Sequence, residues 1–205
     1  RLTLVMMAAL LMVGMVGIKP PKPVQAALPT DLFFSEYIEG YNYNKAIEIY
    51  NGTGSPVNLS DYRLELYSNG AGAPGGNTVV LSGTLESGDV FVVSRSDAAQ
   101  EIVNQADLLN STVVNWNGND AIALYKLSTK SFVDVFGQIG FDPGSYWGTN
   151  PAITENRTLV RKVNICAGDP DGSNAFDPAT EWDWYGQDTF TYIGWHTSNC
   201  APEPP

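Results

Sequence analysis

The chain has 205 residues, of which 43% are hydrophobic, and this is enough for one domain with its own core. Only 16% of the residues are charged and the formal net charge is −11, so the surface repels nucleic-acid phosphates and anionic lipid. Direct binding to nucleic acid is therefore not expected, whereas 10 Tyr, 8 Phe, 5 Trp and 20 Gly residues favour strands and turns.

Residues 1–26 are typical of a secretory signal peptide that is incomplete at its N-terminus, because the chain starts at Arg1. An apolar run over 2–18 leads to residues 24–26, Val-Gln-Ala, which fit the small-x-small cleavage rule. We expect residues 27–30 to be a short spacer and the mature protein to be secreted, extracellular and free of the membrane. An uncleaved membrane anchor is the alternative, and Lys19 and Lys22 directly after the run favour it.

A period of two in hydrophobicity follows the spacer and is typical of half-buried strands. In residues 46–50, for example, Ile47 and Ile49 share one face, and Glu48 lies on the other. The turn at 86–88 is predicted to make a hairpin of the strands before and after it. The predicted strands span residues 32–37, 46–50, 62–67, 78–85, 89–94, 120–126, 132–140 and 158–162.

One short helix is predicted over 96–104, with Ser96 or Asp97 as its N-cap. About eight strands and one helix predict an all-β protein, an antiparallel β-sandwich, over residues 31–200. Residues 201–205 are Pro-rich and are predicted to be a tail or the start of a linker.

The loop Asn51–Pro56 is predicted to connect strands, because Gly and Pro supply turn conformations and the Lys of a phosphate-binding loop is missing. Glu48 lies in the strand just before this loop. It has two interpretations, a general acid or a structural acceptor of hydrogen bonds from the amides of a neighbouring loop. The structural role is favoured, since carboxylates with perturbed pKa values are often structural.

Two cysteines, Cys166 and Cys200, are expected to form a disulfide in an oxidising compartment, with two free thiols as the alternative. The bridge would close a loop of about 35 residues and stabilise the fold by about 3–4 kcal/mol. The chain has one histidine, His196, and no Gly-x-Ser-x-Gly motif, so neither a catalytic triad nor a zinc site is predicted. No catalytic residue is proposed from the sequence.

The acidic stretch 168–178 offers oxygen ligands on a Gly-containing loop, which suits Ca²⁺. Its order departs from the EF-hand pattern, and a solvated turn beside the disulfide is the favoured interpretation. Calcium is the one cofactor that the sequence suggests. The candidate ligands are Asp169, Asp171, Asn174 and Asp177.

Six aromatic residues near the C-terminus are either a platform for carbohydrate or peptide or part of the core and the sheet edge, and a core role is favoured. They are Trp182, Trp184, Tyr185, Phe190, Tyr192 and Trp195. Four N-x-S/T sequons fit exposed loops, and their asparagines are Asn51, Asn58, Asn110 and Asn156.

Several segments, in the same order, resemble a lamin-tail domain. The first are 45–51 (KAIEIYN) and 57–64 (VNLSDYRL), and the matching segments that follow are 85–93, 117–125, 133–137, 158–162 and 176–182. The resemblance covers roughly residues 31–196. It implies an immunoglobulin-like β-sandwich without chemistry of its own, in which Glu48 and Trp182 have structural roles.

The segment around Cys166, Trp182 and Cys200 is similar to lamin-tail domains of secreted bacterial proteins, which often precede the catalytic domain of extracellular nucleases. The resemblance therefore implies a secreted, non-catalytic accessory or interaction module. Its partner would be an unknown protein or a cell-surface component. Two alternatives stay open: an N-terminal fragment of an extracellular nuclease whose catalytic domain is not in this chain, and a calcium-stabilised adhesin-like domain.

Overall fold

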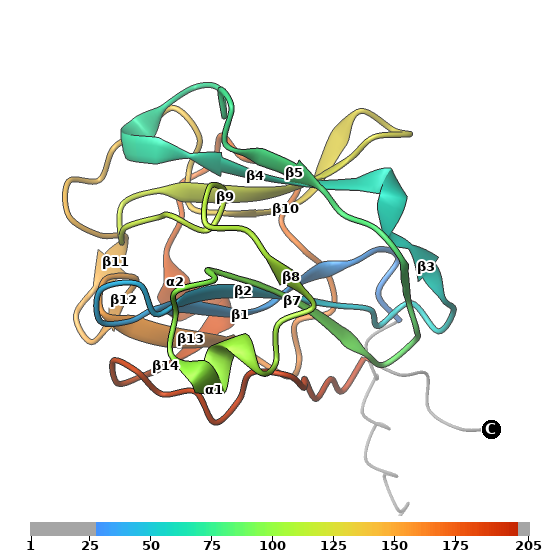
Figure 1. Cartoon of the computed structure of the whole chain (residues 1–205). Coiled ribbons are helices and arrows are strands. Elements are labelled where there is room, and N and C mark those ends of the chain that lie inside the picture. The colour runs from blue at the N-terminus through green and yellow to red at the C-terminus, as the bar shows by residue number, and fades with distance from the viewer. Residues whose placement is uncertain (1–27, 201–205) are drawn as a thin grey trace, which may run out of the picture.

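Two β-sheets packed face to face dominate residues 28–200, the part of the chain that the computed structural model describes (Figure 1). The predicted signal peptide and the Pro-rich tail lie outside the described residues. Within residues 28–200, no helix has the length and hydrophobicity needed to cross a membrane.

The larger sheet has six strands in the order β14-β13-β1-β2-β7-β8. Neighbouring strands are antiparallel, except that the short β8 runs parallel to β7. The bounds are β1 Phe33–Glu39, β2 Lys45–Tyr50, β7 Val90–Ser94, β8 Leu108–Leu109, β13 Arg157–Arg161 and β14 Trp182–Tyr185.

The smaller sheet has four strands in the order β10-β9-β4-β5, and two strand pairs lie outside both sheets. The bounds in the sheet are β4 Tyr62–Tyr67, β5 Thr78–Val80, β9 Ala121–Lys126 and β10 Ser131–Phe136. The extra pairs are β3 Val57–Asn58 with β6 Thr84–Leu85, and β11 Gly148–Thr149 with β12 Ala152–Ile153. The helices are α1 Gln100–Val103, α2 Pro178–Glu181 and the 3-10 turns η1 Leu59–Asp61 and η2 Ser68–Gly70.

This architecture confirms the predicted immunoglobulin-like β-sandwich and corrects three details. The turn at 86–88 is not a hairpin, because β6 pairs with β3 whereas β7 joins the six-stranded sheet beside β2. The predicted helix over 96–104 shrinks to the four residues of α1. A second helix, α2, was missed, although Asp177 caps it by accepting a hydrogen bond from the amide of Ala179 and Pro178 occupies its first turn.

The main core lies between the two sheets and follows from the alternation of the strands. Ile47 and Ile49 of β2 are fully buried in it, opposite Leu64 and Leu66 of β4 in the facing sheet. Tyr37 stacks between Trp116 and Phe136, with ring centroids 5.7 and 4.3 Å away. Large apolar side chains of this kind supply most of the free energy of folding.

A buried ion pair also joins the two sheets. Arg161 of β13 donates from Nη1 to Oδ2 of Asp134 on β10 over 3.0 Å, and both side chains are almost inaccessible to solvent. Asp134 further accepts hydrogen bonds from the amides of Phe34 and Asp169, each over 2.8 Å. One carboxylate therefore fixes β1, β10, β13 and the loop after Cys166 relative to one another.

The last described residues cross the outer face of the six-stranded sheet, below it in Figure 1. We call residues 190–200 the C-terminal strap. Ile193 packs there in a second cluster with Ile38, Ala46 and Ile102. Gly194 has a φ of +96°, and a Cβ on it would come within 2.6 Å of Oε1 of Gln105, so the strap's path needs glycine here.

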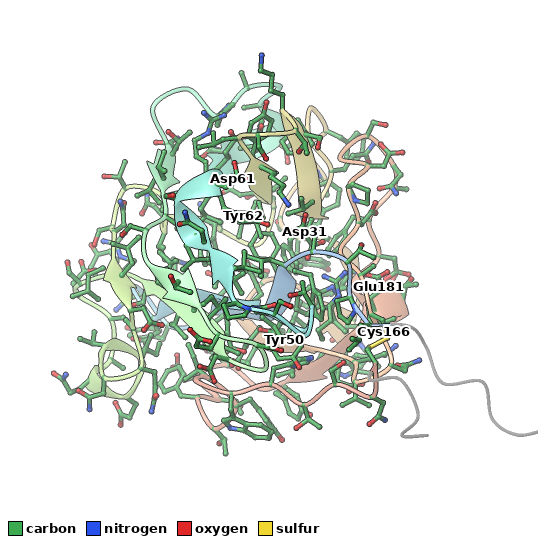
Figure 2. All side chains as sticks on the ribbon, turned by 90° about the vertical axis from the view of Figure 1, so that its right-hand side faces the viewer. Asp31, Tyr50, Asp61, Tyr62, Cys166 and Glu181 are labelled. Carbon is green, nitrogen blue, oxygen red and sulfur yellow. A yellow bond between two sulfur atoms is a disulfide. The ribbon has the colours of Figure 1, made fainter. Side chains whose placement is uncertain are left out.

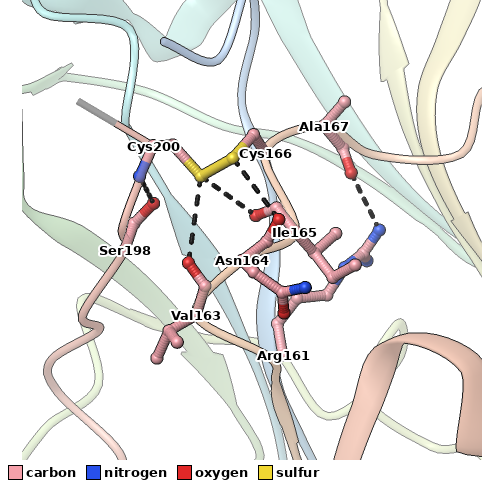
Figure 3. Close-up of a disulfide and its surroundings, with 8 residues drawn as sticks. All are labelled: Arg161, Val163, Asn164, Ile165, Cys166, Ala167, Ser198 and Cys200. Carbon is pink, nitrogen blue, oxygen red and sulfur yellow. Dashed lines mark hydrogen bonds between the residues drawn. A yellow bond between two sulfur atoms is a disulfide. The ribbon is translucent and has the colours of Figure 1, made fainter. Parts of the chain in front are cut away.

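A disulfide between Cys166 and Cys200 ends the strap, as predicted (Figure 3). The amide of Asn199 donates to the carbonyl of Val163 over 2.8 Å, and the carbonyl of Ile165 lies 3.5 Å from Sγ of Cys200. In Figure 2, Cys166 lies at the same side of the molecule as Glu181, the second ion-pair partner of Arg161. The strap is thus fastened beside β13.

The loop after β2 is held by its first residue. Asn51 is fully buried, and its Nδ2 donates to the carbonyls of Ser55 and Leu85, each over 2.8 Å. Its Oδ1 accepts from the amide of Thr53 over 3.0 Å. Asn51 is thus the residue that shapes this turn, and it contradicts the prediction that all four sequons lie in exposed loops.

Replacing Asn51 by Ala is expected to lower the free energy of unfolding by about 2 kcal/mol, because the buried carbonyl of Leu85 loses its donor and the turn loses the other hydrogen bonds of Asn51. Urea unfolding followed by tryptophan fluorescence measures the change. Ser55→Ala in the same loop is the control, since the Ser55 carbonyl and its hydrogen bond remain. Equal effects of the two substitutions would contradict the structural role of Asn51.

Candidate functional site

A groove on the outer face of the six-stranded sheet, between the strap and the β13–β14 edge, is the candidate site. Its volume is about 200 Å³. Strands β13 and β14 and the residues after β13 form its floor, and the strap forms its other wall. The lining residues are Val160, Arg161, Val163, Asp183, Tyr185, Tyr192, Trp195, His196 and Thr197.

Three aromatic side chains give the groove its character. The rings of Tyr185 and Tyr192 lie 4.4 Å apart, and Trp195 follows at 6.2 Å from Tyr192. The hydrogen bond between the two tyrosine hydroxyls, with some burial, raises the pKa of Tyr185 to about 12. The Tyr185 hydroxyl therefore stays protonated at neutral pH, and both tyrosines line the groove.

Trp195 is the most exposed of these aromatic residues, with 54% of its surface accessible. Its indole Nε1 donates to the carbonyl of Thr191 over 3.3 Å, which orients the ring while leaving much of it in solvent. Trp184 is also 41% exposed, whereas Trp182 lies in the main core. Trp184 thus lies on an edge strand, which the interpretation as core and sheet edge allows, whereas that interpretation was wrong for Trp195, because the strap runs over the surface.

Two carboxyl groups lie beneath the strap, side by side across β1 and β2. Glu36 pairs directly with Glu48, and on its other side with Val160 of the groove. The Glu48 carboxylate accepts from Oγ of Ser35 and from the amide of Gly194, each over 2.7 Å. Glu48 therefore joins the strap to the sheet, because it accepts one hydrogen bond from Ser35 on the neighbouring strand β1 and one from Gly194 of the strap.

Burial is the main cause of the perturbed pKa values of both groups. It raises the pKa of Glu48 to about 7 against the opposing effect of its hydrogen bonds. It raises the pKa of Glu36 to about 9, with a further contribution from the charge of Glu48. Both carboxyl oxygens of Glu36 are buried without a hydrogen-bond partner, so Glu36 is neutral at pH 7.

His196 lies at the inner end of the groove, edge-on to two aromatic rings. Its ring centroid is 4.9 Å from that of Tyr50 and 6.0 Å from that of Phe33. Burial, followed by the nearby charge of Arg161, lowers the pKa of His196 to about 4. The imidazole is therefore neutral under physiological conditions, and its Nε2 is buried.

A second and larger hollow, of about 510 Å³, lies on the other side of Trp195. Gly194 and Trp195 line it from the strap, and Phe91 and Asp107 line it from the β7 side. The rest of its wall is Leu59 and the chain around β6, residues 82–86 and 88–90. Trp195 therefore forms a ridge between two concave surfaces.

The predicted calcium ligands lie beside β10. Arg161 lies between them and the groove, because it lines both the groove and the hollow next to these residues. Asp169 accepts from the amide of Asp171 and from Nδ2 of Asn174, and its carbonyl accepts from the amide of Val135, which extends the edge of β10. Asp169, Asn174 and Asp177 line a small hollow of about 190 Å³, but Asp171 does not. Within residues 28–200, no three His, Cys, Asp or Glu side chains are grouped as metal ligands. Calcium binding and an adhesin-like role stay predictions.

Sequence reasoning missed Glu36, Arg161 and Asp134. Glu36 and Asp134 each follow a strand residue at which the pairing register shifts, so a simple alternation cannot assign their faces. An acidic residue inside an otherwise apolar strand was the available signal. Glu48 was singled out on that ground, but Glu36 and Asp134 carry the same signature.

A protein-family model described as Lamin Tail Domain matches residues 25–140. No match was found among curated proteins or among solved structures. The matched range ends after β10, whereas β13 and β14, the floor of the groove, lie beyond it. The groove is thus built largely from the part of the chain that follows the family match.

Proposed function

The chain belongs to the lamin tail domain family, and we therefore propose that it acts outside the cell as a non-catalytic β-sandwich module that holds a partner. The observation that carries this proposal is Trp195. A large aromatic side chain is 54% exposed and fixed in orientation on a strap that a disulfide anchors. Exposed aromatic residues on a rigid support are typical of binding sites.

The disulfide supports action outside the cell, because such bonds persist in oxidising compartments.

The state of the titratable groups at the groove supports a role without catalysis. His196 is neutral with a pKa of about 4, and Glu36 is neutral with both oxygens buried, so neither exchanges a proton readily with a bound molecule at pH 7. Glu48 is occupied in holding the strap.

Mass spectrometry of the native product, with and without reductant, combined with hydrolase and nuclease assays, tests this proposal. We expect a secreted species without turnover that gains two hydrogens, about 2 Da, when the single disulfide is reduced. Turnover by the purified chain would refute the non-catalytic role. A native mass far above 22.2 kDa would favour the alternative of a larger extracellular nuclease.

A further inference from the structure

We propose that Trp195 and the two hollows beside it bind a neutral polysaccharide chain. This inference rests on the proposed function and names the chemical class of the partner. Pyranose rings have apolar C–H faces and polar hydroxyl edges, so a site for them needs an exposed aromatic face next to hydrogen-bonding groups.

Trp195 supplies the aromatic face. Its Nε1 is already bonded to the carbonyl of Thr191, so the indole has no need of a polar partner and can stack on an apolar sugar face. The Tyr185–Tyr192 pair continues the aromatic wall into the groove. A ring stacked on Trp195 would place its edge against this wall.

Hydrogen-bonding groups surround the aromatic wall. Asp183 and Thr197 are exposed at the groove, and Tyr185 and Tyr192 add two phenol hydroxyls. A carboxylate, a secondary alcohol and two phenols can both accept from and donate to sugar hydroxyls. This mixed lining distinguishes the groove from a purely apolar docking surface.

Charge selects a neutral partner. The groove carries Asp183, and the larger hollow carries Glu86, Asp89 and Asp107. The single cationic residue that lines either hollow in residues 28–200 is Arg161, whose guanidinium is already paired with Asp134 and Glu181. Uronic acids and sulfated sugars would meet uncompensated negative charge.

The shape of the site selects a chain over a single sugar. Because Trp195 stands between hollows of about 200 and 510 Å³, a ring stacked on it has room for neighbouring rings on both sides. The strap is fixed on both sides of Trp195, by the Gly194–Glu48 hydrogen bond and by the disulfide at Cys200, so little conformational entropy is lost on binding.

Isothermal titration calorimetry of the full chain with cellohexaose, xylohexaose and mannohexaose tests the inference. We expect at least one of these neutral hexasaccharides to bind saturably, more tightly than its disaccharide and than an anionic hexagalacturonate. Trp195→Ala is expected to weaken this binding by roughly tenfold or more, through loss of stacking. Trp184→Ala is the matched control, because Trp184 is also exposed but does not line the groove.

Circular dichroism and melting temperature establish that both variants are folded. Failure of all three hexasaccharides to bind at millimolar concentration would overturn the inference, as would equal losses for Trp195→Ala and Trp184→Ala. Either result leaves the non-catalytic module standing. Cleavage of a bound hexasaccharide, detected by chromatography, would instead refute the proposed function.

Discussion

Replacing Asp134 by Asn is expected to lower the free energy of unfolding by about 3–5 kcal/mol, the cost of breaking a buried ion pair by removing one partner. Asp134 accepts from Arg161 and from the amides of Phe34 and Asp169. All three partners are donors, so an amide group in place of the carboxylate would bring an N–H against at least one of them. Arg161 would keep its charge in the interior with only the half-buried Glu181 to balance it.

Urea unfolding at constant pH measures this loss. Asp97→Asn is the control, because Asp97 also pairs with an arginine, Arg95, but its side chain is 46% exposed. Exposed ion pairs contribute little to stability, so the control should unfold almost as the parent does. Equal unfolding midpoints for Asp134→Asn, Asp97→Asn and the parent would show that the pair between the sheets is not needed.

Replacing Glu36 by Gln is expected to stabilise the protein, and by more as the pH rises. The pKa of Glu36 is about 9 in the folded chain against an ordinary value of 4.5, so between these values the unfolded chain loses the proton and the folded chain keeps it. Ionisation therefore favours unfolding, and the parent loses stability from pH 4.5 upwards until about pH 9. At pH 7 the penalty is on the order of 3 kcal/mol.

Thermal unfolding between pH 4.5 and pH 9 measures the effect, with the exposed Glu101→Gln as the control. The difference between Glu36→Gln and the parent should be small at pH 4.5 and grow with pH. Glu48, with a pKa of about 7, leaves a smaller decline in the variant up to that pH. His196 affects stability at lower pH. Because its pKa is about 4 in the folded chain and 6.5 in the unfolded chain, the unfolded chain binds a proton first, and stability falls as the pH falls from 6.5 to about 4. Parallel curves for parent and variant would contradict the buried, neutral state of Glu36.

The sandwich itself was predictable, because local alternation decides it. Ile47 and Ile49 point into the core as their spacing requires, and the strands predicted over 120–126 and 132–140 are found as the antiparallel pair β9 and β10. The two cysteines form the expected bridge. The core-facing residues follow from the alternation of strand side chains, the pair of β9 and β10 follows from the short turn between them, and the disulfide follows because two cysteines allow one pairing.

The candidate site was not predictable, because its contacts join residues far apart in the chain. Glu48 and Gly194 are separated by 146 positions, and Phe34 and Asp134 by 100. The residues next to Trp195 in the sequence do not indicate whether its ring lies on the surface or in the core. The hairpin predicted at residues 86–88 was wrong for a related reason. The residues of a turn indicate that the chain reverses, but they do not indicate to which sheet each flanking strand belongs.

The disulfide also decides how the domain would carry mechanical load. A pull on the chain at Cys200 passes through the sulfur bridge to Cys166, and from there along the backbone towards β13, which lies inside the six-stranded sheet. The intervening residues, including α2, β14 and the whole strap, lie outside that covalent path. Tension on an attached neighbour would therefore strain β13 and the interior of the sandwich, while β14 and the strap with Trp195 stayed unloaded.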